Sequence, residues 1–279
     1  LATYMFDMGG VDIKKALDYI KNNPDEMRFP KLDKNSDIEK LSNRVFGVAG
    51  YYKQVEAAKN NGEYNVPGDL VFYISRPIKG QVSFNTTHIG NINGTNADDL
   101  TRAEIEGRKQ MMEVVNFAVK YLPGFENAYL LKSAVQVGIR ETRRIIGEYK
   151  FSEDDVANAR KFDDAIARLA YYVDIHCGSG KGYTKSEEKK KLIGPPDGDW
   201  YEIPFRCLMP KKLINVLMAG RCISSTQGGH GAIRIMPACC AMGQAAGTAA
   251  AISIKYKIKI SDINFIKIKQ TLARDGAIV

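Results

Sequence analysis

The segment Ala219–Ala251, AGRCISSTQGGHGAIRIMPACCAMGQAAGTAAA, joins a glycine-rich stretch to a plain alanine-rich run. Pro237 suits the first turn of a helix because its φ is fixed near the helical value and it has no N–H to satisfy. We therefore expect a helix from Pro237 to about Lys255. The free N–H groups and positive dipole end at its start can bind an anion or an electron-rich carbonyl.

Glycines on both sides of Pro237 suggest close approach by another group. Gly243 and Gly247 are four residues apart on one helix face, where a second backbone or a flat ligand can come near. From that spacing alone, a tightly packed buried helix explains the pattern more simply than a ligand site. The stretch Gly228–Gly231, predicted to be flexible backbone ahead of the helix, favours the ligand site.

Apolar periodicity elsewhere predicts an α/β fold, with mixed sheets and helices. The first sixty residues predict a helical cap, and alternating residues around Pro77–Gly80 predict a hairpin. Thr101–Tyr121 is expected to be a long helix, followed by strands at Leu130–Ile139 and Arg144–Tyr149.

Later segments complete this expected fold. The run IARLAYYVDIH is expected to be a further strand, and WYEIPFRCLMP a short strand and turn. Ile214–Ala219 is continuously apolar and predicts a strand buried in a covered sheet. A last helix is expected from Ser261 to about Ala273.

The composition excludes several classes of protein. With 279 residues, 44% of them hydrophobic and 26% charged, the chain is globular in composition. The formal net charge of +8 comes from scattered lysines that concentrate in exposed-looking stretches such as Lys185–Lys191 and Lys255–Lys269. This favours a solvated surface, or attraction for anionic small molecules, over a nucleic-acid partner. The uncharged run Ile235–Ile254 is too weakly apolar for insertion into a bilayer, so we expect no membrane partner. The five cysteines are odd in number and form no CxxC, which predicts reduced core residues, no metal site and a cytoplasmic location.

Six separated motifs resemble, in order, those of the FAD-dependent oxidoreductase family, whose FAD domain is similar to that of glutathione reductase. They are DLTRAEIEGRKQ, VGIRETRRIIGEY, DDAIARLAYYVDIH, DGDWYEIPFRCLMP, NVLMAGRCIS and GAIRIMPACCAMGQAAGTAAA. The resemblance covers nearly the whole chain. It implies an enzyme that transfers hydride or electrons between a small organic substrate and FAD.

The resemblance also implies a division of the chain. Residues 1–210 would form the substrate and cap domain, and residues 211–279 the C-terminal part of the FAD-binding domain, rejoined through the strand Ile214–Ala219. The helix from Pro237 would point its start at the flavin pyrimidine carbonyl. The implied cofactor-binding residues are Gly220, Arg221, Pro237, Gly243 and Gln244.

One departure from the family pattern bears on the cofactor. Family members begin with a strand and a GxGxxG turn that holds the FAD pyrophosphate, and this sequence contains no such turn. The chain therefore resembles the C-terminal portion of a longer enzyme, with a missing N-terminal FAD-domain segment as its partner, and the isolated fragment is expected to be inactive. The alternative is a non-catalytic binding or interaction domain that does not hold FAD on its own.

Arginine and histidine supply the candidates for the substrate side. Arginine forks suit carboxylates and phosphates, so an anionic substrate is the sharper expectation, and histidine is readily poised for proton transfer near neutral pH. In the RETRR stretch, salt bridges to Glu141 and Glu148 are an equally good explanation of the arginines. The candidate catalytic residues are His230, Arg140, His176 and Arg234.

Overall fold

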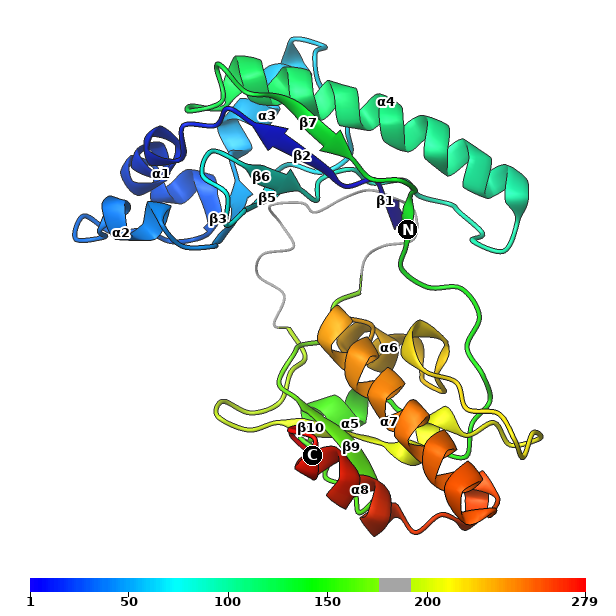
Figure 1. Cartoon of the computed structure of the whole chain (residues 1–279). Helices are drawn as coiled ribbons and strands as arrows, with labels where there is room; N and C mark the ends of the chain where they lie inside the picture. The colour runs from blue at the N-terminus through cyan, green and yellow to red at the C-terminus, as the bar shows by residue number, and fades with distance from the viewer. Residues whose placement is uncertain (176–191) are drawn as a thin grey trace. The chain divides into compact units, whose positions relative to one another are not determined.

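The computed structural model describes residues 1–175 and 192–279, which belong to two compact units (Figure 1). The described part of the first unit is Leu1–Ile139, and that of the second is Arg140–Ile175 together with residues 192–279. Each unit has its own hydrophobic core. The expected boundary between a substrate domain and an FAD-binding part at residues 210/211 is a functional division and stays a prediction.

A six-stranded antiparallel sheet forms the centre of the first unit, in the order β3-β4-β5-β6-β2-β7. Aromatic rings pack together in the core: the Phe84 ring stacks on Phe6 at 5.1 Å between centroids, and it lies 5.4 Å from Tyr73 and 5.9 Å from Phe125. The strands are β2 (Phe6–Gly9), β3 (Met27–Phe29), β4 (Gly47–Gly50), β5 (Val71–Ser75), β6 (Val82–Phe84) and β7 (Tyr129–Ser133), and a separate pair joins β1 (Ala2–Thr3) to β8 (Gly138–Ile139).

Three of the four α-helices described in the first unit begin at a side chain that caps a free N–H group. Asp12 accepts a hydrogen bond from the Lys15 N–H at 3.0 Å, and Asn96 accepts one from the Asp99 N–H at 2.9 Å. The long helix α4 passes along the sheet (Figure 1). The helices are α1 (Ile13–Asn22), α2 (Ile38–Ser42), α3 (Tyr52–Asn60) and α4 (Ala97–Tyr121), with a 3₁₀ turn at Pro24–Glu26.

Several predictions for this unit are confirmed and one is wrong. The hairpin is the β5–β6 pair, and the helix predicted at Thr101–Tyr121 lies within α4. The first sixty residues are not a helical cap, because strands β1 to β4 alternate there with three helices. Gly50 explains part of the difference: a Cβ at this position would lie 2.6 Å from the Glu26 carbonyl oxygen, so the chain passes close to its neighbouring segment there.

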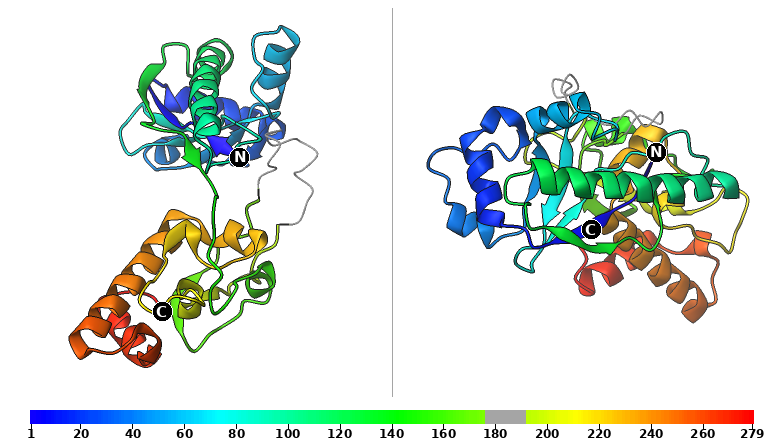
Figure 2. Two further views of the ribbon diagram at one scale, coloured as in Figure 1. Left: turned by 90° about the vertical axis from the view of Figure 1, so that its right-hand side faces the viewer. Right: turned by 90° about the horizontal axis from the view of Figure 1, so that it is seen from above.

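The second unit combines a two-stranded antiparallel ribbon with helices (Figure 2). Helix α8 packs against α7, and both contact strand β9. The elements are α5 (Glu153–Ala157), β9 (Ala165–Leu169), β10 (Tyr201–Pro204), α6 (Gln227–Ile233), α7 (Met236–Tyr256) and α8 (Phe265–Arg274), with 3₁₀ turns at Phe205–Leu208, Gly220–Cys222 and Ile260–Asp262. The predicted α/β fold class is confirmed, and every strand pairing within the described ranges is antiparallel.

Two predicted strands are absent from the second unit. Ile214–Ala219 is irregular, and Arg144–Tyr149 makes only an isolated bridge, between Gly147 and Pro210. A strand is stabilised by neighbours that pair with its N–H and C=O groups, and no described strand lies beside Ile214–Ala219. Ile214 is 70% exposed, so this apolar run lacks the covering sheet that its sequence predicts.

Helix length and composition bear on the membrane question. Within residues 1–175 and 192–279, no single helix is both long and apolar enough to cross a bilayer. Helices α6 and α7 reach that length and composition only as a pair, and the chain bends by 91° between them.

Candidate functional site

The glycines of α6 pack tightly against other segments of the second unit. A Cβ at Gly229 would lie 2.6 Å from the Phe151 carbonyl oxygen, and one at Gly231 would lie 3.0 Å from the Asp174 carbonyl oxygen. The prediction of flexible backbone at Gly228–Gly231 is therefore wrong, since these residues form a buried helix. Because glycine has no side chain, α6 can pack directly against the backbone at Phe151 and Asp174.

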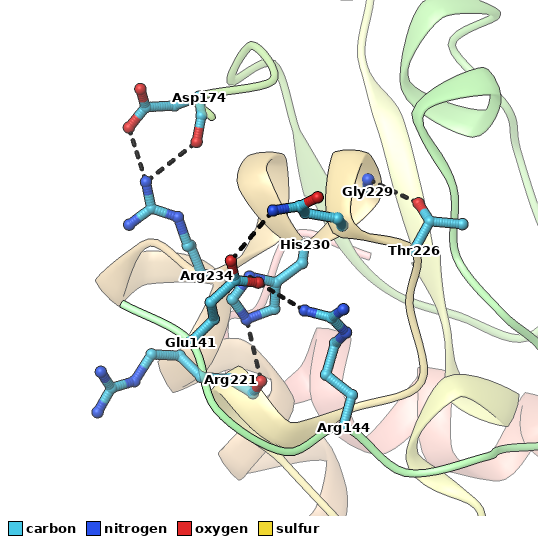
Figure 3. Close-up of polar contacts among 9 residues, drawn as sticks. Glu141, Arg144, Asp174, Arg221, Thr226, Gly229, His230 and Arg234 are labelled. Atoms are coloured by element: carbon cyan, nitrogen blue, oxygen red, sulfur yellow. Dashed lines mark hydrogen bonds and ion pairs between the residues drawn. The ribbon is translucent and has the colours of Figure 1, made fainter. Parts of the chain in front are cut away.

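Thr226 fixes the start of α6. Its Oγ1 accepts a hydrogen bond from the Gly229 N–H at 2.9 Å, as a helix N-cap does (Figure 3). The same hydroxyl donates to Glu153 Oε2 at 2.5 Å. Thr226 was not among the predicted site residues, although a threonine before Gln-Gly-Gly is a possible N-cap signal in the sequence.

His230 lies in the middle of α6 and is only 2% exposed. Its Nε2 lies 3.0 Å from the carbonyl oxygen of Arg221 (Figure 3). A carbonyl oxygen only accepts, so Nε2 carries the hydrogen and, in the neutral ring, Nδ1 carries the lone pair. His230 thus ties the turn at Arg221 to α6.

The second nitrogen of His230 faces a carboxylate. His230 Nδ1 lies 3.9 Å from Glu141 Oε2, and the same oxygen accepts from Arg144 at 2.6 Å. Gln227 donates to the other carboxylate oxygen, Oε1, at 3.3 Å. The alternative that the RETRR arginines form salt bridges is confirmed for Arg144. Glu141 and Gln227 were not predicted as site residues.

Burial and charge set the protonation of this pair. Burial lowers the pKa of the His230 imidazole below its ordinary value, with Arg144 and Arg234 adding to the effect and the Arg221 carbonyl and Glu141 opposing it. Burial acts to raise the pKa of the Glu141 carboxyl, but Arg144, Gln227 and His230 outweigh it and lower that pKa overall. The arrangement favours a neutral imidazole beside an ionised carboxylate.

Arg234 ends α6 and pairs with the segment before residue 176. Its Nη2 donates to the Asp174 carbonyl oxygen at 3.0 Å and to Asp174 Oδ2 at 2.9 Å (Figure 3). This ion pair compensates the positive charge of Arg234. Arg234 therefore secures the Asp174 segment in this structure.

The turn at Gly220–Cys222 lies beside the first turn of α7. Gly220 has a φ of 81°, in the left-handed region that favours glycine, and a Cβ there would lie 3.9 Å from Cys239 Sγ. Arg221 is exposed. Helix α7 starts as predicted, with Pro237 in its first turn, and among the described residues it has no side-chain cap and no acidic residue in that turn.

One face of α7 is exposed and made mostly of small residues. We call it the α7 face: Met236, Cys240, Gly243, Gly247 and Ala251, which recur every three or four residues and are all exposed. A Cβ at Gly243 or Gly247 would meet no described atom within 4 Å, apart from the helix's own backbone and chain neighbours. The predicted residues Pro237 and Gln244 are exposed as well.

The remaining predicted residues are less informative. Arg140 is the first residue of the second unit and directly precedes Glu141. His176 lies outside the described residues. Within the described ranges, no group of three or more His, Cys, Asp or Glu residues is arranged to hold a metal ion.

Comparison with protein families identifies the class of protein. The family model described as FAD dependent oxidoreductase matches residues 1–272. The chain belongs to this family, which makes it an oxidoreductase and implies an FAD cofactor in the full-length protein. No curated protein and no solved structure matches the chain.

The residues at the start of α7 fit part of an FAD molecule. An uncapped helix start can donate to an electron-rich carbonyl, and open space over Gly243 and Gly247 leaves room for a flat ring. The sequence contains no GxGxxG turn for the pyrophosphate. The start of α7 is therefore compatible with a flavin ring, and the sequence lacks the family's pyrophosphate turn.

Replacing His230 with glutamine should flatten the pH dependence of stability in mildly acidic solution. Unfolded histidine titrates near pH 6.5, and the folded pKa of His230 is lower. The contribution of the neutral His230 ring to the free energy of unfolding is therefore fully present above about pH 6.5, and it is lost as the pH falls toward the folded pKa. Urea unfolding of both proteins across this range measures the difference, and parallel profiles would contradict the buried neutral imidazole.

Proposed function

We propose that the protein transfers hydride or electrons between a small organic substrate and FAD. The observation that carries this proposal is the uncapped, exposed start of α7, followed by glycines with open space above them, in a chain of the FAD dependent oxidoreductase family. Bound FAD supplies the redox chemistry, and the chain supplies placement and electrostatics.

Helix α7 and the turn before it take the cofactor side in this proposal. The N–H groups at the start of α7 stabilise negative charge on the flavin ring, and Pro237 shapes that turn. Gly243 and Gln244 lie along the ring's side of the helix, while Gly220 and Arg221 lie where the cofactor passes.

Of the predicted catalytic residues we retain Arg140, His176 and Arg234 on the substrate side, with an anionic group on the substrate, and His230 as a positioning residue. His230 is buried and hydrogen-bonded to the Arg221 carbonyl. Its role in the proposal is therefore to position Arg221 through that bond.

We further propose that an FAD-domain segment outside this chain is its partner. Two observations support this: no described strand pairs with the apolar run Ile214–Ala219, in which Ile214 is 70% exposed, and the sequence contains no GxGxxG turn. Strands from such a segment would cover the apolar run and supply the pyrophosphate turn, and the α7 face would remain for the flavin ring. The boundary at residues 210/211 would then separate the substrate domain from the FAD-binding part.

A second candidate is a binding or interaction domain that does not hold FAD on its own. The absence of a GxGxxG turn from the sequence favours it for the isolated chain.

We place the protein in the cytoplasm, a proposal supported by four described cysteines that are free thiols. No nucleic-acid partner enters the proposal, because the sequence carries no motif for one.

An absorbance spectrum of the purified full-length protein tests the function. We expect flavin bands, and FAD identified by mass after denaturation. A parallel FAD titration of the 279-residue chain should give much weaker binding than the full-length protein. A colourless full-length protein that does not take up added FAD would contradict the enzyme and favour the binding domain.

A further inference from the structure

Glu141 joins two segments of the second unit that are distant in sequence. Its Oε2 accepts a hydrogen bond from Arg144 Nη1 at 2.6 Å (Figure 3), within the stretch of residues 140–145 that we call the RETRR segment. Its Oε1 accepts from Gln227 Nε2 at 3.3 Å, and Gln227 is the first residue of α6. The carboxylate therefore fastens the RETRR segment to α6.

Both of these segments also hold the turn at Gly220–Cys222. The Ile145 N–H, in the RETRR segment, donates to the Cys222 carbonyl oxygen at 2.9 Å. His230, in α6, holds the neighbouring carbonyl, because its Nε2 lies 3.0 Å from the Arg221 oxygen (Figure 3). Two consecutive carbonyls of the turn are thus held from two segments, and Glu141 links those segments to each other.

We propose that Glu141 is a positioning residue for Arg221. It keeps α6 and the RETRR segment together, so that the carbonyls of Arg221 and Cys222 meet their two donors at the same time. The backbone from which the Arg221 side chain projects is thereby fixed. The consequence for FAD rests on the proposed function, in which Arg221 lies where the cofactor passes, whereas the holding of the turn does not.

The charge of Glu141 gives this role a distinctive signature. Glu141 Oε2 lies 3.9 Å from His230 Nδ1, the ring nitrogen that does not face the turn. A carboxylate at this place favours the protonated ring. Burial and the charges of Arg144 and Arg234 oppose it, so the pKa of His230 is lowered overall. Removing the Glu141 charge should lower that pKa further.

Two other carboxylates lie against α6, and each has a partner of its own. Glu153 Oε2 accepts from the Thr226 hydroxyl at 2.5 Å, at the start of the helix. Asp174 Oδ2 pairs with Arg234 at 2.9 Å, at the end of the helix. Neither contact involves the imidazole, so a change in the His230 titration on replacing Glu141 reports on the Glu141 carboxylate.

Three substitutions in the full-length protein test this role. Glu141→Gln keeps the size of the side chain and an oxygen that can accept from Arg144, but it removes the charge. Glu141→Ala removes the charge and both hydrogen bonds. Glu148→Gln is the matched control, because Glu148 is exposed a few residues along the chain and makes no ion pair or hydrogen bond with His230 in the described structure.

Two readouts need no FAD: the pH titration of the His230 ring by NMR, identified by its loss in His230→Gln, and hydrogen exchange. Both Glu141 variants should lower the pKa of His230 to a similar extent, because both lose the same charge. Exchange of the Ile145 and Ile223 N–H groups, which hydrogen-bond to carbonyls of the turn, should be fastest in Glu141→Ala. Exchange in strand β9 should be unchanged, and Glu148→Gln should leave all of these values unaltered.

The FAD affinity of the full-length protein is the third readout. It should fall roughly fivefold in Glu141→Ala, the equivalent of one hydrogen bond, and by less in Glu141→Gln. An unaltered His230 titration and unaltered exchange in Glu141→Ala would overturn the role of Glu141, whether or not FAD binds. Normal FAD affinity with faster exchange at the turn would overturn its link to the cofactor. A full-length protein that binds no FAD contradicts the proposed function instead, and the titration and exchange still decide whether Glu141 holds the turn.

Discussion

Replacing Gly229 with alanine should destabilise the second unit by about 3 kcal/mol, the upper part of the range for overpacking a core. The added Cβ would lie 2.6 Å from the Phe151 carbonyl oxygen and 2.9 Å from the Ser152 Cα. Both are backbone atoms, so no flexible side chain can move aside. The helix α6 and the segment at Phe151 would have to separate.

Gly243 provides the matched control for this prediction. It also lies in a helix, but a Cβ there would meet no described atom within 4 Å other than the helix backbone and its chain neighbours. Gly243→Ala should therefore raise stability by about 0.5–1 kcal/mol, the ordinary gain in a helix. Urea unfolding measures both variants, with hydrogen exchange of α6 as a local readout. Equal stability of the two variants would show that α6 does not pack on Phe151 as described.

The sequence predicts best those elements whose cause is local. Pro237 fixes the start of α7, and the turn between Pro77 and Gly80 joins strands β5 and β6. The apolar spacing in Thr101–Tyr121 identifies α4. In each case the neighbouring residues carry the signal, so no knowledge of the rest of the chain is needed.

Glycine patterns are ambiguous because they allow either mobility or close packing. The sequence favours mobility at Gly228–Gly231, whereas contacts with Phe151 and Asp174 make this stretch a buried helix. Those partners are more than fifty residues away along the chain. Local spacing does not identify them, so only the three-dimensional structure separates the two interpretations.

Strand predictions fail for a related reason, because a strand depends on partners that are distant in sequence. The apolar run Ile214–Ala219 has the composition of a buried strand, yet strand structure requires neighbours, and no described strand pairs with it. The first sixty residues show the reverse case, because residues at helical spacing include the paired strand β4 (Gly47–Gly50). In both cases, hydrogen-bond pairing with a neighbouring strand determines whether the segment is a strand.

The candidate site is partly predictable. His230, Arg221 and Arg234 stand out by residue type, and the structure brings the first two into a hydrogen bond. Their partners Glu141 and Asp174 come from segments distant in sequence. Asp174 compensates the charge of Arg234, and Glu141 faces His230. The spacing of residues along the chain does not predict either pairing.

Gly243→Phe should abolish FAD binding by the full-length protein, with an affinity loss on the order of a hundredfold or more. Under the proposed function a flat ring lies on the α7 face, and an aromatic side chain at Gly243 would occupy that space. A steric conflict of 2–3 kcal/mol corresponds to roughly a hundredfold in affinity. The fold should survive, because the space around Gly243 is open within the described structure.

Two further variants separate a specific clash from a general effect of a bulky residue. Ala273→Phe places the same side chain at an exposed position near the end of α8 and should leave the flavin spectrum unchanged. Gly243→Ala adds a single methyl group and should retain FAD. Flavin absorbance per mole of purified protein measures all three, and urea unfolding confirms that each is folded. A normal FAD content in Gly243→Phe would mean that the flavin does not lie on the α7 face, because a ring in contact with Gly243 leaves no room for phenylalanine.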